Sequence, residues 1–184
     1  MTAQIDDKFN FKNNEYSIAG MSQGELFHPS IFGLEPVSNC TACWRGYQAF
    51  FAVSNNKLIL KDLFLNLLEV EASEGPNSRG FSITKKGPAI NGVKPGSDED
   101  HTMEFDNYYK ELDYPLKYSG GLLITDEFIK GLYVHMGFQK PWKYEKVIEI
   151  IFEEGVLEDE IDRSEQMEDL RNRFINPDRE DTKP

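Results

Sequence analysis

The hydrophobic pattern of this chain is richest between Cys40 and Leu68. From Cys43 to Val53, apolar and aromatic side chains occupy both alternating faces, which is typical of a strand covered on both sides. Asn55 and Asn56 enter the left-handed region at modest cost and favour a tight turn. A second apolar run, from Leu58 to Leu67, follows them. We therefore predict a long central hairpin.

The alternation of the second run changes phase at Lys61 and Asp62. One extra residue in a strand moves all later side chains to the other face, so this change predicts a β-bulge. A hairpin with aromatic side chains on both faces requires further elements on each side. We predict a single α+β domain over residues 1–174: a mainly antiparallel sheet around this hairpin, with two or three short helices packed on it.

Shorter alternating runs predict further strands on both sides of the hairpin. They are Phe9–Phe11 with Tyr16–Ile18 around Asn13–Asn14, Phe81–Thr84, Met103–Tyr109, Tyr114–Ile124 with a turn at Ser119–Gly121, and Ile148–Phe152 with Val156–Ile161. The last pair could instead continue a helix, but its β-branched residues and the Gly155 turn favour a hairpin. The polar connection 72–101 is long enough to be either functional or disordered.

Helical patterns are fewer and lie mainly in the last third of the chain. One turn is expected at Ser30–Gly33. Thr125 or Asp126 can cap a helix that continues through Val134, and Pro141 suits the first position of another. Ser164 can cap a final helix that ends near Phe174. Residues 175–184 have too little apolar content to pack and predict a disordered tail.

The charge is strongly acidic and uneven. The net charge is −12, and Glu145–Pro184 carry 14 acids against 6 bases, a balance of −8. This argues against a nucleic-acid partner and against attraction to an anionic membrane. With no signal-like N-terminus, no long apolar run and only two cysteines, we expect a cytoplasmic protein.

The spacing of Cys40 and Cys43 is the one local pattern with a known chemistry. In a redox motif, the helix that follows the first thiol activates it, whereas here a strand is predicted. A zinc site would need further ligands, and His28, His101 and His135 lack paired spacing. Ordinary reduced thiols are favoured, with a redox pair and a metal site as alternatives. We expect no metal and no cofactor.

Aromatic neighbours make Arg45 and His135 candidates for a ligand pocket. A guanidinium between Trp44 and Tyr47 can hold a carboxylate or phosphate, or can pair internally. Cys43, His135 and Asp126 could form a nucleophile arrangement, although nothing in their spacing requires them to meet. The alternative ligand-pocket set is Trp44, Arg45, His135 and Trp142.

Carboxylates crowd the predicted C-terminal hairpin. Like charges along a strand cost stability unless something offsets them, and a cationic partner would do so. The candidate partner-binding residues are Glu153, Glu154, Glu158, Asp159, Glu160 and Asp162.

We therefore expect a non-catalytic acidic protein that binds a basic protein partner. Size and charge, though no motif, are shared with small acidic inhibitors such as immunity proteins. A ligand-binding protein or enzyme with the aromatic pocket is the alternative, and a thiol oxidoreductase is a third. No catalytic residue can be assigned, and the oligomeric state stays open.

Overall fold

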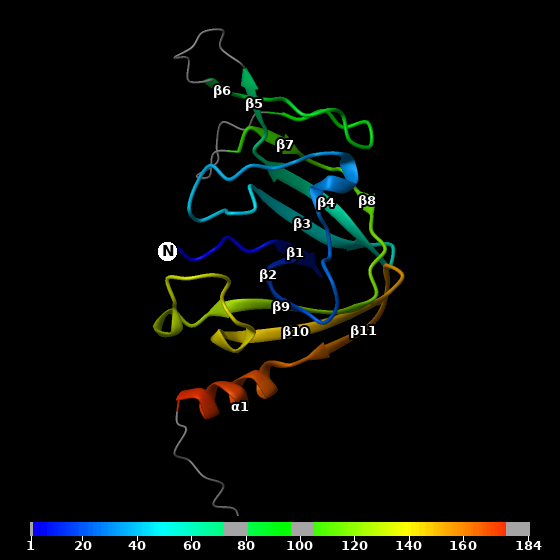
Figure 1. Ribbon diagram of the computed structural model, residues 1–184. Helices are drawn as coiled ribbons and strands as arrows, with labels where there is room; N and C mark the ends of the chain where they lie inside the picture. Colours follow the sequence, from blue (N-terminus) through cyan, green and yellow to red (C-terminus); the bar gives the residue numbers. More distant parts are fainter. Residues whose placement is uncertain (1, 72–80, 97–104, 176–184) are drawn as a thin grey trace, which may run out of the picture.

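The computed structural model describes residues 2–71, 81–96 and 105–175 (Figure 1). They form a mostly sheet single domain with one α-helix in the described part. The strands of the main sheet are β1 (Lys8–Phe11), β2 (Asn14–Met21), β3 (Tyr47–Ser54), β4 (Lys57–Leu65), β7 (Asn107–Tyr109), β8 (Tyr114–Pro115), β9 (Gly120–Phe128), β10 (Tyr144–Glu153) and β11 (Val156–Asp162).

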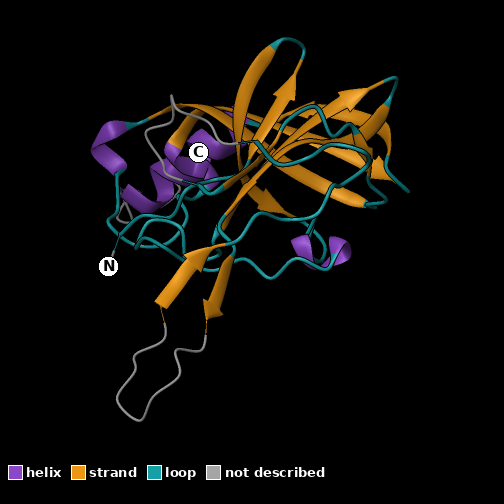
Figure 2. Cartoon of the chain, turned by 90° about the horizontal axis from the view of Figure 1, so that it is seen from above, coloured by secondary structure: helices purple, strands orange, loops and turns teal. Residues whose placement is uncertain are grey.

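The remaining elements are short or lie outside the main sheet. Strands β5 (Leu68–Glu71) and β6 (Phe81–Thr84) form a separate two-stranded ribbon, which stands apart from the main sheet in Figure 2. The helical elements are the 3-10 turns η1 (Pro29–Phe32), η2 (Lys130–Leu132) and η3 (Pro141–Lys143), and the α-helix α1 (Ser164–Ile175). No helix in the described part of the chain has the length and apolar character needed to cross a bilayer.

The main sheet curls until its two sides meet. Its strand order is β11-β10-β9-β2-β1-β3-β4-β7, with β8 also beside β4. Strands β1 and β3 are parallel, and the other neighbours are antiparallel. Val156 of β11 pairs with Lys57 of β4, and the Leu58 N–H donates to the Gly155 carbonyl at 2.8 Å. This contact joins the chain's last hairpin to its long third and fourth strands.

The curled sheet encloses a core of large apolar side chains. Phe9, Phe51 and Phe152 come from three different strands and are at most 1% exposed. The rings of Phe9 and Phe152 lie 6.3 Å apart. Each such burial stabilises the fold by roughly 2–3 kcal/mol, so the apolar alternation of these strands drives the curling.

The predicted hairpin forms, but it is not confirmed as the centre of the fold. Asn55 and Asn56 have φ of 49° and 63° and connect β3 to β4. The register shifts opposite Lys61, where the phase change predicted a bulge. The first strand begins at Tyr47 rather than Cys43, and the hairpin lies towards the β7 side of the strand order.

The prediction of a helix from Thr125 or Asp126 to Val134 is wrong. Strand β9 continues to Phe128, because β10 pairs with it as far as Tyr144 opposite Phe128. These backbone bonds to a long neighbour outweigh the local helical spacing. Pro141 begins only the single turn η3, so two of the expected helices are 3-10 turns or strand.

Other local predictions agree with the structure. The hairpins β1–β2 and β10–β11, strand β6, the η1 turn and helix α1 are all present. The Asp162 carboxylate accepts the Ser164 N–H at 2.8 Å, whereas the Ser164 hydroxyl bonds to Val147. Only Asn107–Tyr109 of the expected strand Met103–Tyr109 is strand among its described residues. The tail beyond Ile175 and residues 72–80 and 97–104 lie outside the described residues.

Candidate functional site

The N-terminal segment, residues 2–7, lies between two loops. The Ile5 N–H donates to Ala42 of the first loop (residues 40–46) at 3.0 Å. The Gln4 N–H donates to Gly137 of the second loop (residues 133–139) at 2.9 Å. Figure 1 shows the N-terminus and the chain after β9 at the same end of the molecule. Segments distant in sequence are thereby joined into one surface.

A buried glutamine holds the first loop. The Gln4 side chain is buried, its amide N–H donates to the Thr41 carbonyl at 2.9 Å, and its Oε1 accepts the Trp44 N–H at 2.9 Å. The amide therefore satisfies a backbone donor and a backbone acceptor of the loop. This arrangement fixes the backbone next to the exposed Trp44 ring.

A second buried glutamine holds the second loop. The Gln139 amide N–H donates to the Val134 carbonyl at 2.8 Å, and its Oε1 accepts the Val134 N–H at 3.3 Å. The same oxygen accepts a hydrogen bond from Lys143 Nζ at 2.9 Å. Burial lowers the pKa of Lys143, and the charge of Lys140 acts in the same direction. Gln139, at the end of the second loop, is thus bonded to Val134 near its start.

The two loops expose a set of apolar side chains. Contiguous exposed apolar surface on a folded protein commonly marks an interaction site. We call this set the aromatic rim: Trp44 (53% exposed), Tyr133 (45%), Val134 (46%), Met136 (53%) and Phe138 (45%).

Arg45 forms an internal pair at the base of the rim. Its guanidinium contacts Asp7 through two hydrogen bonds, Nη1 to Oδ2 at 2.8 Å and Nη2 to Oδ1 at 2.9 Å. The guanidinium carbon lies 4.6 Å from the Tyr47 ring centre and 5.3 Å from that of Phe138. Burial favours a lower pKa for Arg45, but the Asp7 hydrogen bonds and charge raise it. The side chain therefore clamps the N-terminal segment and is already engaged by a carboxylate.

Asp6, beside this clamp, is a partly buried carboxyl group with a strongly raised pKa. Burial raises its pKa to about 6, despite the opposing charge of Lys8. Its Oδ2 lies 3.5 Å from the Tyr144 hydroxyl, and its Oδ1 is buried without a hydrogen-bond partner. The setting favours the protonated carboxyl. In the sequence, Asp6 belongs to a charged run just before a strand, and this pattern did not predict that its side chain is partly buried.

The four residues predicted to line a pocket come from three segments of the chain. Trp44 and Arg45 belong to the first loop, and His135 is exposed on the second, with its ring 4.7 Å from that of Tyr133. Trp142 instead stacks on Phe174 of α1, with 5.2 Å between ring centres.

The cysteine pair lies in a turn rather than at a helix N-terminus. Cys40 is exposed and Cys43 is buried, and the Cys43 N–H bonds to the Cys40 carbonyl at 3.3 Å. The Cys43 thiol donates to the Tyr47 carbonyl, and burial raises its pKa. The raised pKa opposes a reactive thiolate at this position. The described residues include no group of three or more potential metal ligands.

The six predicted partner-binding carboxylates lie on one hairpin, β10–β11, and we call this set the acidic edge. Glu153 and Glu154 lie at the β10–β11 turn, and the other four, Glu158, Asp159, Glu160 and Asp162, lie on β11. All six are exposed.

Internal contacts engage only part of the acidic edge. Glu160 pairs with Lys12 at 2.5 Å. The Asp159 carboxylate accepts the Glu160 N–H at 2.8 Å, which withdraws this donor from pairing with another strand. Hydrogen bonds from Ser164 lower the pKa of Asp162. Among the described residues, Glu153, Glu154 and Glu158 have no cationic partner within 4.0 Å.

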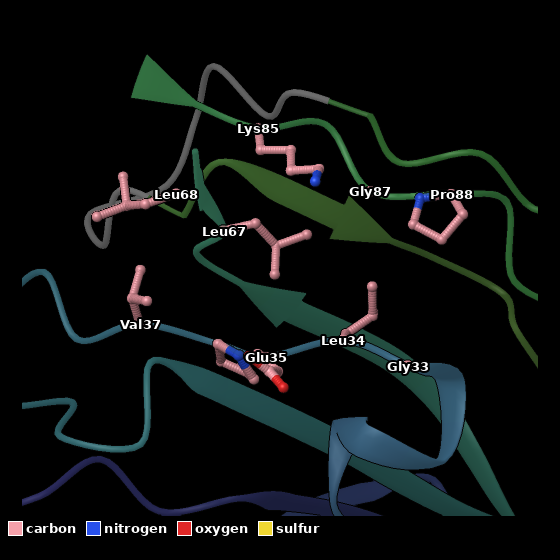
Figure 3. Close-up of a pocket in the computed structure, with 10 residues that line it drawn as sticks. Gly33, Leu34, Glu35, Val37, Leu67, Leu68, Lys85, Gly87 and Pro88 are labelled. Atoms are coloured by element: carbon pink, nitrogen blue, oxygen red, sulfur yellow. The ribbon is translucent and has the colours of Figure 1, made fainter. Parts of the chain in front are cut away.

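Two hollows lie elsewhere on the surface. One, of about 460 Å³, lies between segments 33–37 and 85–88, with Leu67 also between them (Figure 3). Another, of about 610 Å³, is lined by residues that include His28, Tyr114 and Lys117. Neither contains Arg45 or His135, and sequence patterns predicted neither.

Comparison of this chain with known protein families, with curated proteins and with solved structures finds no match.

Proposed function

We propose that this chain is a non-catalytic binding protein that engages a basic protein partner through the acidic edge. The observation that carries this proposal is the exposure of Glu153, Glu154 and Glu158 without a cationic partner in the described structure. Like charges on adjacent positions repel, and a cationic surface would relieve that repulsion. Neutralisation of a basic target, as an inhibitor or immunity-type protein would achieve, is the corresponding activity.

The contact is expected to be made by side chains. The Glu160 N–H already donates to the Asp159 carboxylate, so this donor is not available to an added strand. A partner that presents lysine and arginine side chains would gain charge-assisted hydrogen bonds to the free carboxylates. Complementary charge of this kind accelerates association and makes it sensitive to salt.

The first test is a capture experiment from a lysate of the native source at low and at moderate salt. A basic protein recovered at low salt and lost at higher salt is the expected result. The recovered protein is then titrated against purified wild-type chain and against the double variant Glu154→Lys with Glu158→Lys. Neither residue has an ionic partner in the described structure, so the variant is expected to fold normally and to bind at least tenfold more weakly.

The matched control is Glu25→Lys with Glu35→Lys, which changes the net charge equally at two exposed acids that do not belong to the acidic edge. This control should retain most of the affinity. Equal loss in both double variants would assign the effect to net charge alone. A partner indifferent both to salt and to the edge variant would refute the proposal.

A further inference from the structure

The segment from Ile129 to Lys143 differs in charge from the rest of this acidic protein. It contains three lysines, a histidine and no Asp or Glu. Lys130 and Lys140 are exposed, before and after the second loop. The apolar members of the aromatic rim therefore lie beside cationic side chains.

The aromatic rim is also held in a defined shape. Gln4 and Gln139 are buried polar residues whose amides bond to the backbone of the two loops. Burial of such amides is tolerated because these hydrogen bonds satisfy them. The rim side chains are each at least 45% exposed. They are thus presented to solvent on loops that these hydrogen bonds hold.

Part of the acidic edge lies far from the rim. Strand β10 runs from Tyr144, next to η3, to Glu153, and ten residues of strand span about 30 Å. This length is several times the Debye length of about 8 Å at physiological salt, so Glu153 and Glu154 contribute little to the potential at the rim. The other end of the edge is nearer, because Asp162 of β11 pairs with Ile148 of β10.

Cationic groups also accompany several carboxylates in this part of the molecule. Asp7 is paired with Arg45, and Glu145 lies 3.2 Å from Arg171. The pKa of Lys146 is raised by its hydrogen bond to Tyr16 and further by the carboxylates of Asp126 and Glu127. These contacts leave Lys130 and Lys140 to attract an external anion.

We propose that the aromatic rim docks on an anionic lipid surface, with its apolar side chains entering the interfacial region and Lys130 and Lys140 contacting phosphate groups. Tryptophan and tyrosine favour the membrane–water interface, and lysines near an anionic leaflet strengthen binding. This is peripheral docking by loops. It differs from the expectation drawn from net charge because Lys130 and Lys140 are exposed beside the rim, whereas Glu153 and Glu154 lie at the far end of β10. It does not depend on the acidic edge.

Trp44 provides a direct reporter of this docking. The chain has two tryptophans, and Trp142→Phe leaves Trp44 alone. Vesicles of phosphatidylcholine with about one-third phosphatidylserine are expected to co-sediment the protein and to shift Trp44 emission to shorter wavelength. Wild-type protein is sedimented in parallel, so that the result does not depend on the substitution. Pure phosphatidylcholine vesicles test the lysine contribution, and they should bind much more weakly.

Variants separate the apolar from the cationic contribution. Met136→Ser with Phe138→Ser should abolish co-sedimentation. Lys130→Gln with Lys140→Gln should weaken binding to anionic vesicles by about 30-fold, from about fivefold for each lysine. Ile31→Ser is the matched control, because Ile31 is 56% exposed on η1, outside the rim. It should bind like wild type.

Three results would overturn the proposal. The first is no co-sedimentation of wild-type protein with anionic vesicles. The second is equal loss in Ile31→Ser and in the rim variant, which would indicate nonspecific adsorption. The third is a self-associated wild-type protein that becomes monomeric with Phe138→Ser in analytical ultracentrifugation, which would assign the rim to a second copy of the chain. None of these results bears on capture through the acidic edge, so the two proposals fail separately.

Discussion

At the scale of single residues, Asp6 makes the unfolding free energy depend on pH. Burial raises its pKa to about 6, against about 3.9 in an unfolded chain. The folded state therefore binds this proton more tightly. The associated stabilisation is fully present below about pH 4 and is lost as the pH rises through 6. We expect a loss of roughly 1–3 kcal/mol in unfolding free energy between pH 4 and pH 8 from this group.

Asp6→Asn resembles the protonated carboxyl and should remove that part of the pH dependence, so the variant becomes more stable than wild type at pH 8. Urea unfolding at pH 4, 6 and 8 measures the difference. Asp113→Asn is the control, because Asp113 is exposed and its φ of 44° is one that asparagine accepts. If Asp6→Asn and Asp113→Asn have the same pH profile, the burial of Asp6 is not the cause.

At the scale of elements, the second loop is held by a side chain in addition to its backbone bond from Gln4. Gln139 bonds to both backbone groups of Val134 and accepts from the buried Lys143. Gln139→Ala leaves these groups without partners and should cost roughly 1–3 kcal/mol. Hydrogen exchange of the amides of residues 134–138 is expected to accelerate, and vesicle binding to weaken, because the rim loses its fixed shape.

Gln166→Ala is the matched control for this variant. Gln166 is exposed on α1 and far along the chain from the loop. It should leave exchange in 134–138 unchanged. Slow exchange in Gln139→Ala would show that other contacts hold the loop.

At the scale of the whole molecule, Gly155 lies where the curled sheet closes. Its N–H donates to Tyr118, and its carbonyl accepts from Leu58, both at 2.8 Å. Its φ is +79°, and an added Cβ would lie 2.0 Å from the Leu116 carbonyl oxygen. We expect Gly155→Ala to lower the unfolding free energy by roughly 3 kcal/mol or more, since strain in the left-handed region adds to a clash with rigid backbone.

Two other glycines separate these effects. Gly92 has a similar φ of +81° but open space around it, so Gly92→Ala should cost about 1–2 kcal/mol from backbone strain alone. Gly131 has neither feature and should tolerate alanine. Thermal and urea unfolding of the three variants provide the comparison. Equal losses for Gly155→Ala and Gly92→Ala would mean that closure of the sheet contributes little.

The sequence by itself determined the features that depend on neighbouring residues. The turn at Asn55–Asn56, the bulge at Lys61, the β10–β11 hairpin and helix α1 follow from local propensity and alternation, and all are present. Turn chemistry and periodicity act over a few residues, so they can be interpreted without the rest of the chain. The acidic edge was likewise visible as composition.

Only the tertiary structure decided which distant segments meet. Strand β9 extends through Phe128 because β10 offers a long partner, and β11 reaches β4 because the core draws the sheet into a curl. Asp7 forms an ion pair with Arg45, which is 38 positions away in the sequence. The aromatic rim arises in the same way, because Gln4 joins two loops that have no sequence relation. Such contacts depend on which buried surfaces complement each other, and periodicity along one segment carries no information about its partner.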